Sequence, residues 1–75
     1  MSVDIDGKSY HCIRGSDVDR DGMYLELSES AGDLLLEVFF SDKSGHMSMT
    51  AFQKDIPLKV VEWLIAEAKE SLPPA

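Results

Sequence analysis

The fold is decided by residues 23–40, which read MYLELSESAGDLLLEVFF. Residues 23–29 alternate between apolar and polar side chains, a pattern typical of a strand that buries one face. The turn residues 30–33 follow, and residues 34–40 are apolar on nearly both faces, as in a strand at the centre of a sheet. This stretch therefore predicts two adjacent antiparallel strands joined by a short turn.

Turn signals on either side of this hairpin indicate further strands. Asp6 and Gly7 separate two strand-like runs and form a strong hairpin signal. Residues 15–22 are polar and rich in aspartate, as in a loop, and residues 41–45 form another turn before a strand over residues 46–52. The chain up to Phe52 therefore predicts a meander of antiparallel strands.

The segment after Asp55 changes to helical periodicity. Its apolar residues recur at the spacing of one helix face: Leu58, Val61, Ile65, Ala68 and Leu72. Asp55 or Ile56 is the expected N-cap, Pro57 suits the first turn, and Pro73 and Pro74 are expected to end the helix. We therefore predict an α+β fold, an antiparallel four- to five-stranded β-meander with one C-terminal α-helix packed on one face, in a single small domain over residues 1–75.

The strand register follows from the two later turns. If the end residues of the turns at 30–33 and 42–45 lie opposite each other, one face of the sheet is wholly apolar and can seat the helix. The rows of this face are Met23, Phe40 and Met47, then Leu25, Val38 and Met49, then Leu27, Leu36 and Ala51. A slip of one residue at Gly45 would instead bury Ser48 and Thr50, so we prefer the unslipped register.

The opposite face of the sheet carries several apolar side chains, and one helix cannot cover both faces. In this register the face presents one apolar patch, made of Tyr24, Leu35, Phe39 and Phe52. An exposed patch of this kind marks an interface, so we predict that these residues bind a partner. The alternative is that a terminal tail or strong curling of the sheet shields much of the patch.

Trp63 is a second candidate for partner binding. It falls on the polar side of the predicted helix, where a large aromatic ring is costly to leave in water. Tryptophan is enriched among the residues that dominate protein interfaces. The alternative is that its ring folds over Val60 at the edge of the core.

The register also places Glu26 directly opposite Glu37, which is unfavourable in an isolated sheet. Arg14 on the neighbouring strand, or a basic group of a partner, is expected to neutralise the pair. Paired carboxylates also serve as acid and base in catalysis. The sequence shows no nucleophile motif beside them, so we expect no enzyme and no catalytic residue.

Two patterns resemble parts of metal sites. Residues 17–22, which contain Asp17, Asp19 and Asp21, match the first half of an EF-hand calcium loop, but Ser28 stands where the loop requires a glutamate. The alternative is an acidic hairpin loop in which Asp21 and Gly22 supply the turn residues and Asp17 forms an Asx-type hydrogen bond. The remaining candidate ligands, His11, Cys12 and His46, lack the spacing of a zinc site. We expect no cofactor and no metal.

Composition limits the classes of partner. The chain carries 14 acidic and 7 basic residues, a formal net charge of −7, which disfavours nucleic acid as a partner. Its one cysteine excludes an internal disulfide, and the N-terminal residues lack the features of a secretory signal. No apolar run is long enough to span a membrane, so we expect a cytoplasmic protein.

These patterns favour a small acidic protein-interaction module without enzymatic activity. Its partner would be another protein or a second copy of the chain, bound through the outer sheet face or through Trp63. One alternative is a module that stacks single-stranded nucleic acid on the aromatic residues of that face. A further alternative is calcium binding by the loop from Asp17 to Asp21.

Overall fold

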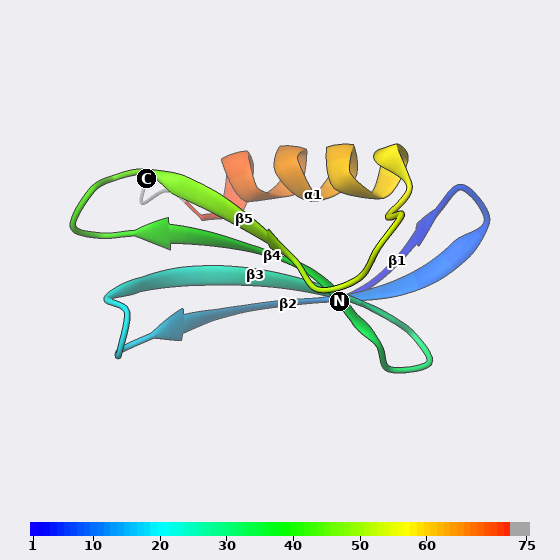
Figure 1. Ribbon diagram of the computed structural model, residues 1–75, viewed down its shortest axis with the longest axis horizontal. Coiled ribbons are helices and arrows are strands. Elements are labelled where there is room, and N and C mark those ends of the chain that lie inside the picture. Colours follow the sequence, from blue (N-terminus) through cyan, green and yellow to red (C-terminus); the bar gives the residue numbers. More distant parts are fainter. Residues whose placement is uncertain (73–75) are drawn as a thin grey trace.

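The computed structural model describes residues 1–72 and shows a sheet of five antiparallel strands with one helix on one of its faces (Figure 1). The elements are β1 (Ser2–Ile5), β2 (Lys8–Asp17), β3 (Gly22–Glu29), β4 (Leu34–Ser41), β5 (Met47–Ala51) and α1 (Leu58–Ser71). The order of the strands in the sheet is their order in the chain. The predicted α+β meander with a C-terminal helix is therefore confirmed, with five strands.

The first hairpin has the tight turn that its sequence predicts. Ile5 of β1 pairs with Lys8 of β2, so only Asp6 and Gly7 lie between the two strands. Both turn residues have positive φ angles, 53° and 84°, as a two-residue turn that matches the twist of the strands requires. Glycine adopts this conformation without steric cost, and aspartate tolerates it better than most residues.

The predicted register is confirmed over most of the sheet. Met23 pairs with Phe40 between β3 and β4, and the ladder between β4 and β5 is unslipped, with Val38 opposite Met49. The register changes at one point, because Ser28 pairs with Leu34 instead of Leu35. This bulge adds a residue to β4 and re-aims the side chains around it.

The helix begins one or two residues later than expected, and its buried face is rotated. Pro57 is the N-cap, in place of Asp55 or Ile56, and its carbonyl oxygen accepts the N–H groups of Val60 and Val61. The residues buried along the helix are Val60, Leu64 and Ala68, whereas two members of the predicted face, Leu58 and Ile65, are 76% and 40% exposed. The predicted helix end at Pro73 and Pro74 lies outside the described residues.

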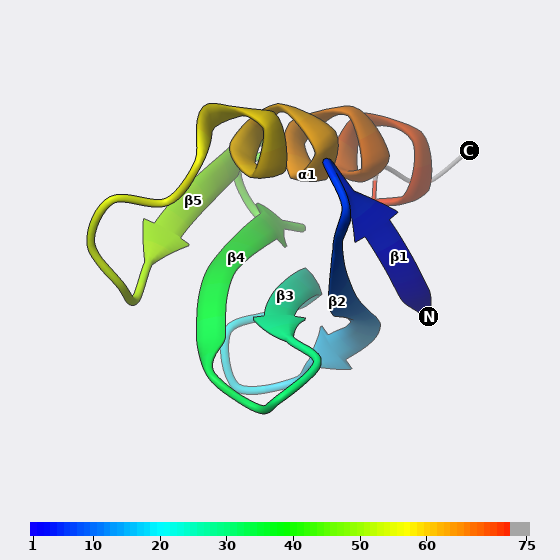
Figure 2. The same ribbon diagram turned by 90° about the vertical axis from the view of Figure 1, so that its right-hand side faces the viewer.

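The sheet curls around α1, with β1 and β5 on opposite sides of the helix (Figure 2). The core lies between them. It consists of Ile5, Tyr10, Cys12, Leu25, Leu27, Leu35, Leu36, Val38, Val60, Leu64, Ala68 and Leu72. Within residues 1–72, the backbone of α1 comes close to that of β1, β3 and β4 but not to that of β2 or β5. In the same residues we find no helix with the length and apolar character that crossing a bilayer requires.

Candidate functional site

The aromatic residues of the outer sheet face are partly covered by the chain itself. Tyr24 lies across Gly15, where the Cβ atom of any larger residue would come within 2.5 Å of the tyrosine hydroxyl oxygen. Phe39 lies across Gly22 in the same way, with its ring tip 2.6 Å from the position that a Cβ atom would occupy. Both rings are half-buried. The two glycines therefore make room for rings from the neighbouring strands.

Arg20, from the loop between β2 and β3, covers this face further. Its guanidinium carbon lies 4.1 Å from the centre of the Phe39 ring. Its two terminal nitrogens donate to the carboxylate of Glu37 at 3.1 and 2.9 Å. The prediction that Arg14 neutralises the glutamate pair is wrong, because Arg14 pairs with the core residue Leu25 and so lies on the helix side of the sheet.

The predicted apolar patch is therefore not exposed as a whole. Leu35 is only 8% exposed, because the bulge in β4 lets Leu35 and Leu36 both enter the core. Of the four patch residues, Phe52 alone remains strongly exposed, at 47%. The expectation of one open aromatic face is corrected: the bulge in β4 and Arg20 of the loop between β2 and β3 cover much of it, whereas the alternative named a terminal tail or curling of the sheet.

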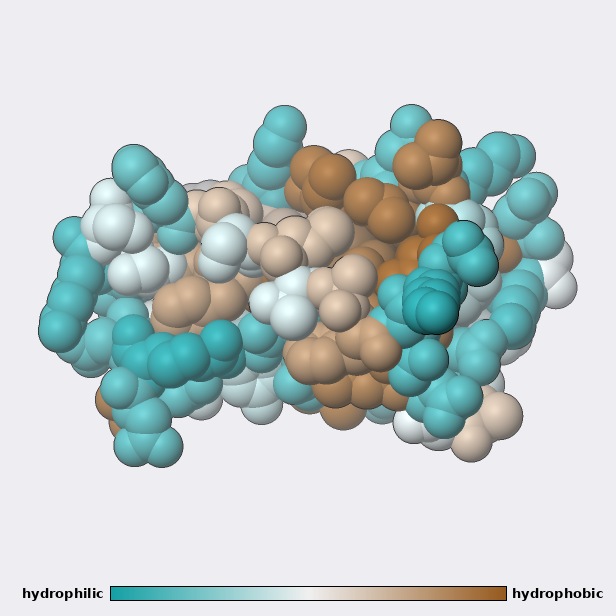
Figure 3. All heavy atoms as spheres, in the orientation of Figure 1, coloured by the Kyte–Doolittle hydropathy of each residue, from teal (hydrophilic) through white to brown (hydrophobic). Residues whose placement is uncertain are grey.

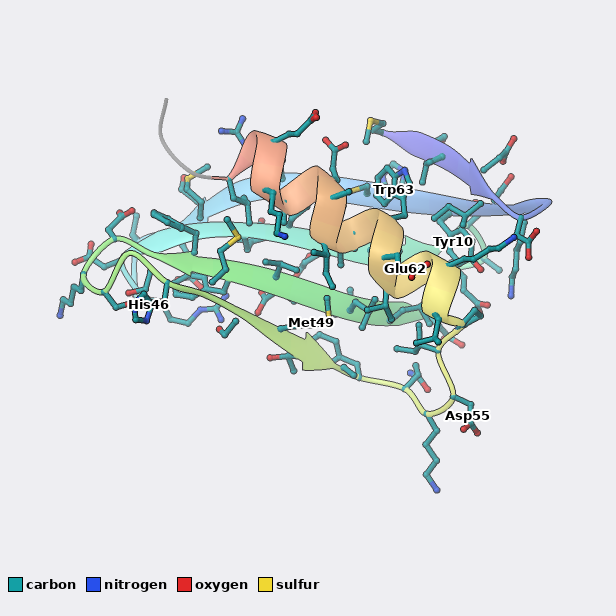
Figure 4. All side chains as sticks on the ribbon, turned by 90° about the horizontal axis from the view of Figure 1, so that it is seen from above. Tyr10, His46, Met49, Asp55, Glu62 and Trp63 are labelled. Carbon is teal, nitrogen blue, oxygen red and sulfur yellow. The ribbon has the colours of Figure 1, made fainter. Side chains whose placement is uncertain are left out.

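Trp63 lies beside β1 (Figure 4). Its ring is half-buried and packs against the core. The rotation of the helix face explains this position, since Trp63 precedes the fully buried Leu64 by one residue, about 100° around the helix. Trp63 therefore contributes to the packing between the helix and the first strand.

The aspartate loop forms its own hydrogen bonds. One carboxylate oxygen of Asp17 accepts the backbone N–H groups of Asp19 and Arg20, both at 3.1 Å, and the other accepts the Arg20 side chain at 2.6 Å. The hydrogen bonds from Arg20 lower the pKa of the Asp17 carboxyl group, and those to both acids raise the pKa of Arg20. No group of three potential metal ligands is found in residues 1–72.

The cysteine and the histidines lie apart from one another. Cys12 is buried in the core, and this burial raises the pKa of its thiol, which favours the neutral form. His11 is exposed on β2, and His46 stands at the start of β5, near the opposite end of that strand from Asp55 (Figure 4). These positions form no shared site.

The least covered element of the sheet is β5. All five of its residues are exposed, and no other strand in the described part of the chain pairs with its outer edge. Its ladder with β4 is anchored at both ends, where Ser41 N–H donates to His46 and Phe52 N–H donates to Leu35. Because hydrogen-bonded pairs alternate along an antiparallel ladder, the N–H and C=O groups that point outward belong to Met47, Met49 and Ala51.

An open cavity of about 230 Å³ runs between β5 and α1. Its lining is mostly apolar and consists of Val38, Met47, Met49, Ile65 and Ala68 together with Ser48 and Lys69. Figure 3 shows this side of the molecule, where apolar side chains extend from the sheet to α1 and polar side chains gather at both ends. The cavity lies where the backbone of α1, close to β3 and β4, is not close to that of β5.

The sequence of β5 has a feature typical of an unprotected edge strand, which the alternation of its residues does not reveal. The residues of β5, MSMTA, include no charge and no proline, the usual protections of a free edge strand.

Comparison with protein families, characterised proteins and solved structures finds no match to this chain. Function is therefore inferred from the geometry of the molecule itself.

Proposed function

We propose that this protein is a non-enzymatic interaction module that binds an extended segment of a protein partner along the outer edge of β5. The observation that carries the proposal is the combination of outward backbone groups at Met47, Met49 and Ala51 with the apolar groove beside them. A segment added to the edge would satisfy these groups by forming a further strand.

The two faces of β5 offer different side-chain contacts to such a segment. Met47 and Met49 point toward the helix and line the groove, where alternate apolar side chains of the partner would be buried. Ser48 and Thr50 lie on the other face and offer hydroxyl groups. Methionine is flexible and polarizable, so it adapts to partner side chains of different shapes.

The geometry gives less support to the other functions. Of the groups considered for catalysis, Glu37 is bound by Arg20 and the Cys12 thiol is buried. A single-stranded nucleic acid needs free aromatic faces, but the ring of Phe39 is stacked against Arg20. A calcium ion would compete with Arg20 for the Asp17 carboxylate.

Selection from a displayed library of random peptides, each about ten residues long, tests this function. Selected peptides should carry apolar residues at alternate positions and should shift the amide resonances of Met47, Met49 and Ala51. Ala51→Pro removes one outward N–H group and leaves the ladder with β4 intact, so it should weaken peptide binding by about tenfold or more.

The matched control is Asp4→Pro on the opposite edge of the sheet. Asp4 N–H also points away from the sheet, because β1 is joined to β2 by hydrogen bonds between Met1 and Cys12 at its start. This variant should bind selected peptides as the wild type does. Failure to select any peptide, or selected peptides whose binding is unaffected by Ala51→Pro, would contradict the proposal.

A further inference from the structure

Resting on the proposed function, we infer that the segment bound at β5 is the β5 strand of a second copy of this chain. The two strands pair antiparallel about a twofold axis at Met49, and the two sheets join into one. Three observations lead to this inference: the arrangement of the outward backbone groups, the apolar groove, and the neutral flanking segments at the two ends of the strand.

The backbone groups select the register. In an antiparallel pair, residues with outward N–H and C=O groups must lie opposite residues of the same kind. When Met49 faces Met49 of the second copy, Met47 faces Ala51 and Ala51 faces Met47. All three outward residues then form hydrogen-bonded pairs. A shift of the register in either direction would leave at least one of them without a partner.

The side chains are compatible with this register on both faces. On the helix face, Met47 and Met49 of the two copies lie side by side between the two α1 helices and fill the grooves that each copy leaves open. Ile65, which is 40% exposed, forms the helix wall of each groove. On the other face, Ser48 lies opposite Thr50, a favourable cross-strand pair.

The charges near β5 do not oppose pairing although the chain as a whole is acidic. The strand itself is uncharged, and each of its flanking segments carries one acid and one base, Asp42 with Lys43 in the turn before it and Lys54 with Asp55 in the bend after it. Each flanking segment is therefore neutral, and the nearest charge on the helix side is the base Lys69 at the groove. The net charge of −7 on each copy repels at longer range.

The register also covers the exposed ring of Phe52. This residue is 47% exposed and follows β5 directly, on the same face as Ser48 and Thr50. In the dimer it lies opposite His46 of the second copy, where the two rings can stack. A hydrophobic side chain that is costly to leave in water thereby gains a contact.

The size of the contact predicts a weak dimer. A five-residue strand and one shallow groove form an interface at the small end of the range for specific complexes. We expect a dissociation constant on the order of 10–100 µM. Because added salt screens the long-range repulsion between the acidic copies, the dimer should become tighter between low and moderate salt.

Charge substitution at Met49 tests the twofold axis. Met49→Lys and Met49→Glu each place two like charges opposite each other, so each variant alone should dissociate at least about tenfold more readily than the wild type. An equimolar mixture of the two variants should restore dimers, because lysine then faces glutamate. Sedimentation equilibrium from micromolar to millimolar concentration measures all three samples, and circular dichroism confirms that each variant is folded.

Cysteine cross-linking tests the same register with substitutions that leave the charge of the chain unchanged. Directly paired residues have Cα atoms about 5.5 Å apart, within the range of a disulfide, so Met49→Cys should form a covalent dimer on oxidation. Ser48→Cys is the matched control, because the two copies of residue 48 lie diagonally, about 7–8 Å apart, and should cross-link poorly. The native Cys12 is buried and should not react.

The outcomes separate this inference from the proposed function. A wild-type chain that stays monomeric to millimolar concentration overturns self-pairing, as does a dimer that neither Met49 charge variant disrupts. Selection of peptides at β5 would still support the edge as a binding surface in either case. If peptide selection fails, the proposed function falls as well, whatever the oligomeric state of the chain.

Discussion

The two free edges of this sheet differ in how the rest of the chain covers them. At one edge, Trp63 packs beside β1 (Figure 4). At the other edge, Ile65 borders an open groove along β5. Both residues adjoin the fully buried Leu64 in sequence, so they lie on opposite flanks of the helix, each about 100° from its most buried line. A bulky ring fills one flank, and a smaller side chain leaves the other open.

The edge strand β1 is also better protected against pairing with another chain than the edge strand β5. The outward groups of β1 belong to Ser2 and Asp4, and Asp4 carries a charge and accepts a hydrogen bond from Ser9 at 2.7 Å. The strand is also short, and the N-terminal amine donates to the carbonyl oxygen of Cys12 at 2.8 Å. Short strands and charged residues protect a free edge from pairing with other chains. At five residues, β5 is almost as short as β1, but it carries no charged residue, so we expect it to be the edge that binds a partner.

The largest expected effect tests the packing on the two helix flanks. Trp63→Ala should lower the free energy of unfolding by about 2 kcal/mol, roughly half the cost for a fully buried ring, because the residue is half-buried. Ile65→Ala on the other flank should cost about 0.5 kcal/mol or less. Urea unfolding at low micromolar concentration, below the dissociation constant expected for the proposed dimer, compares the two variants. Equal losses would mean that the groove beside β5 is packed in solution.

Substitution of Glu37 tests whether its contact with Arg20 stabilises the covered outer face of the sheet, as the packing of Trp63 stabilises the β1 edge. Its side chain is 9% exposed and accepts two hydrogen bonds from Arg20. Glu37→Gln removes the charge and one of these bonds, and should lower the free energy of unfolding by about 1 kcal/mol.

Glu26→Gln is the matched control for this substitution. Glu26 lies directly opposite Glu37, so neutralising it relieves repulsion and should leave stability unchanged or slightly higher. Urea unfolding of both variants at neutral pH gives the comparison. If the two substitutions have the same effect, the contact between Arg20 and Glu37 does not hold the loop on the outer face.

Local patterns in the sequence predicted the strands and most of their register, but neither the bulge in β4 nor the extension of β2 through Asp17, which was expected in a loop. Alternation over residues 23–29 and the turn residues between the strands act within a few positions, so tertiary packing had little to change. The helix was also predicted, but its orientation was not. Residues 58–68 contain two overlapping apolar faces, one through Leu58 and Ile65 and one through Val60 and Leu64, and the curl of the sheet decides which is buried.

The candidate site was harder to predict because it depends on distances between elements. The run Leu34, Leu35 and Leu36 contains no polar residue that marks the bulge, so the burial of Leu35 could not be foreseen. Arg20 reaches Glu37 only because its loop folds over the sheet. The open edge appears because one helix is too narrow to cover all five strands, which periodicity within a strand does not report.

The smallest expected effect concerns the ion pair between Lys59 and Asp6, which joins α1 to the turn beside β1 at 3.4 Å. Both side chains are more than two thirds exposed, at 68% and 69%, so solvent and salt screen the attraction. Lys59→Ala should therefore change the free energy of unfolding by about 0.5 kcal/mol or less, and added salt should abolish the difference. Urea unfolding at two salt concentrations measures it. A loss of stability as large as that of Trp63→Ala would show that the ion pair holds β1 to the helix. A small loss would show that the packing of the Trp63 ring closes this edge. The β5 side of the helix has no such ring.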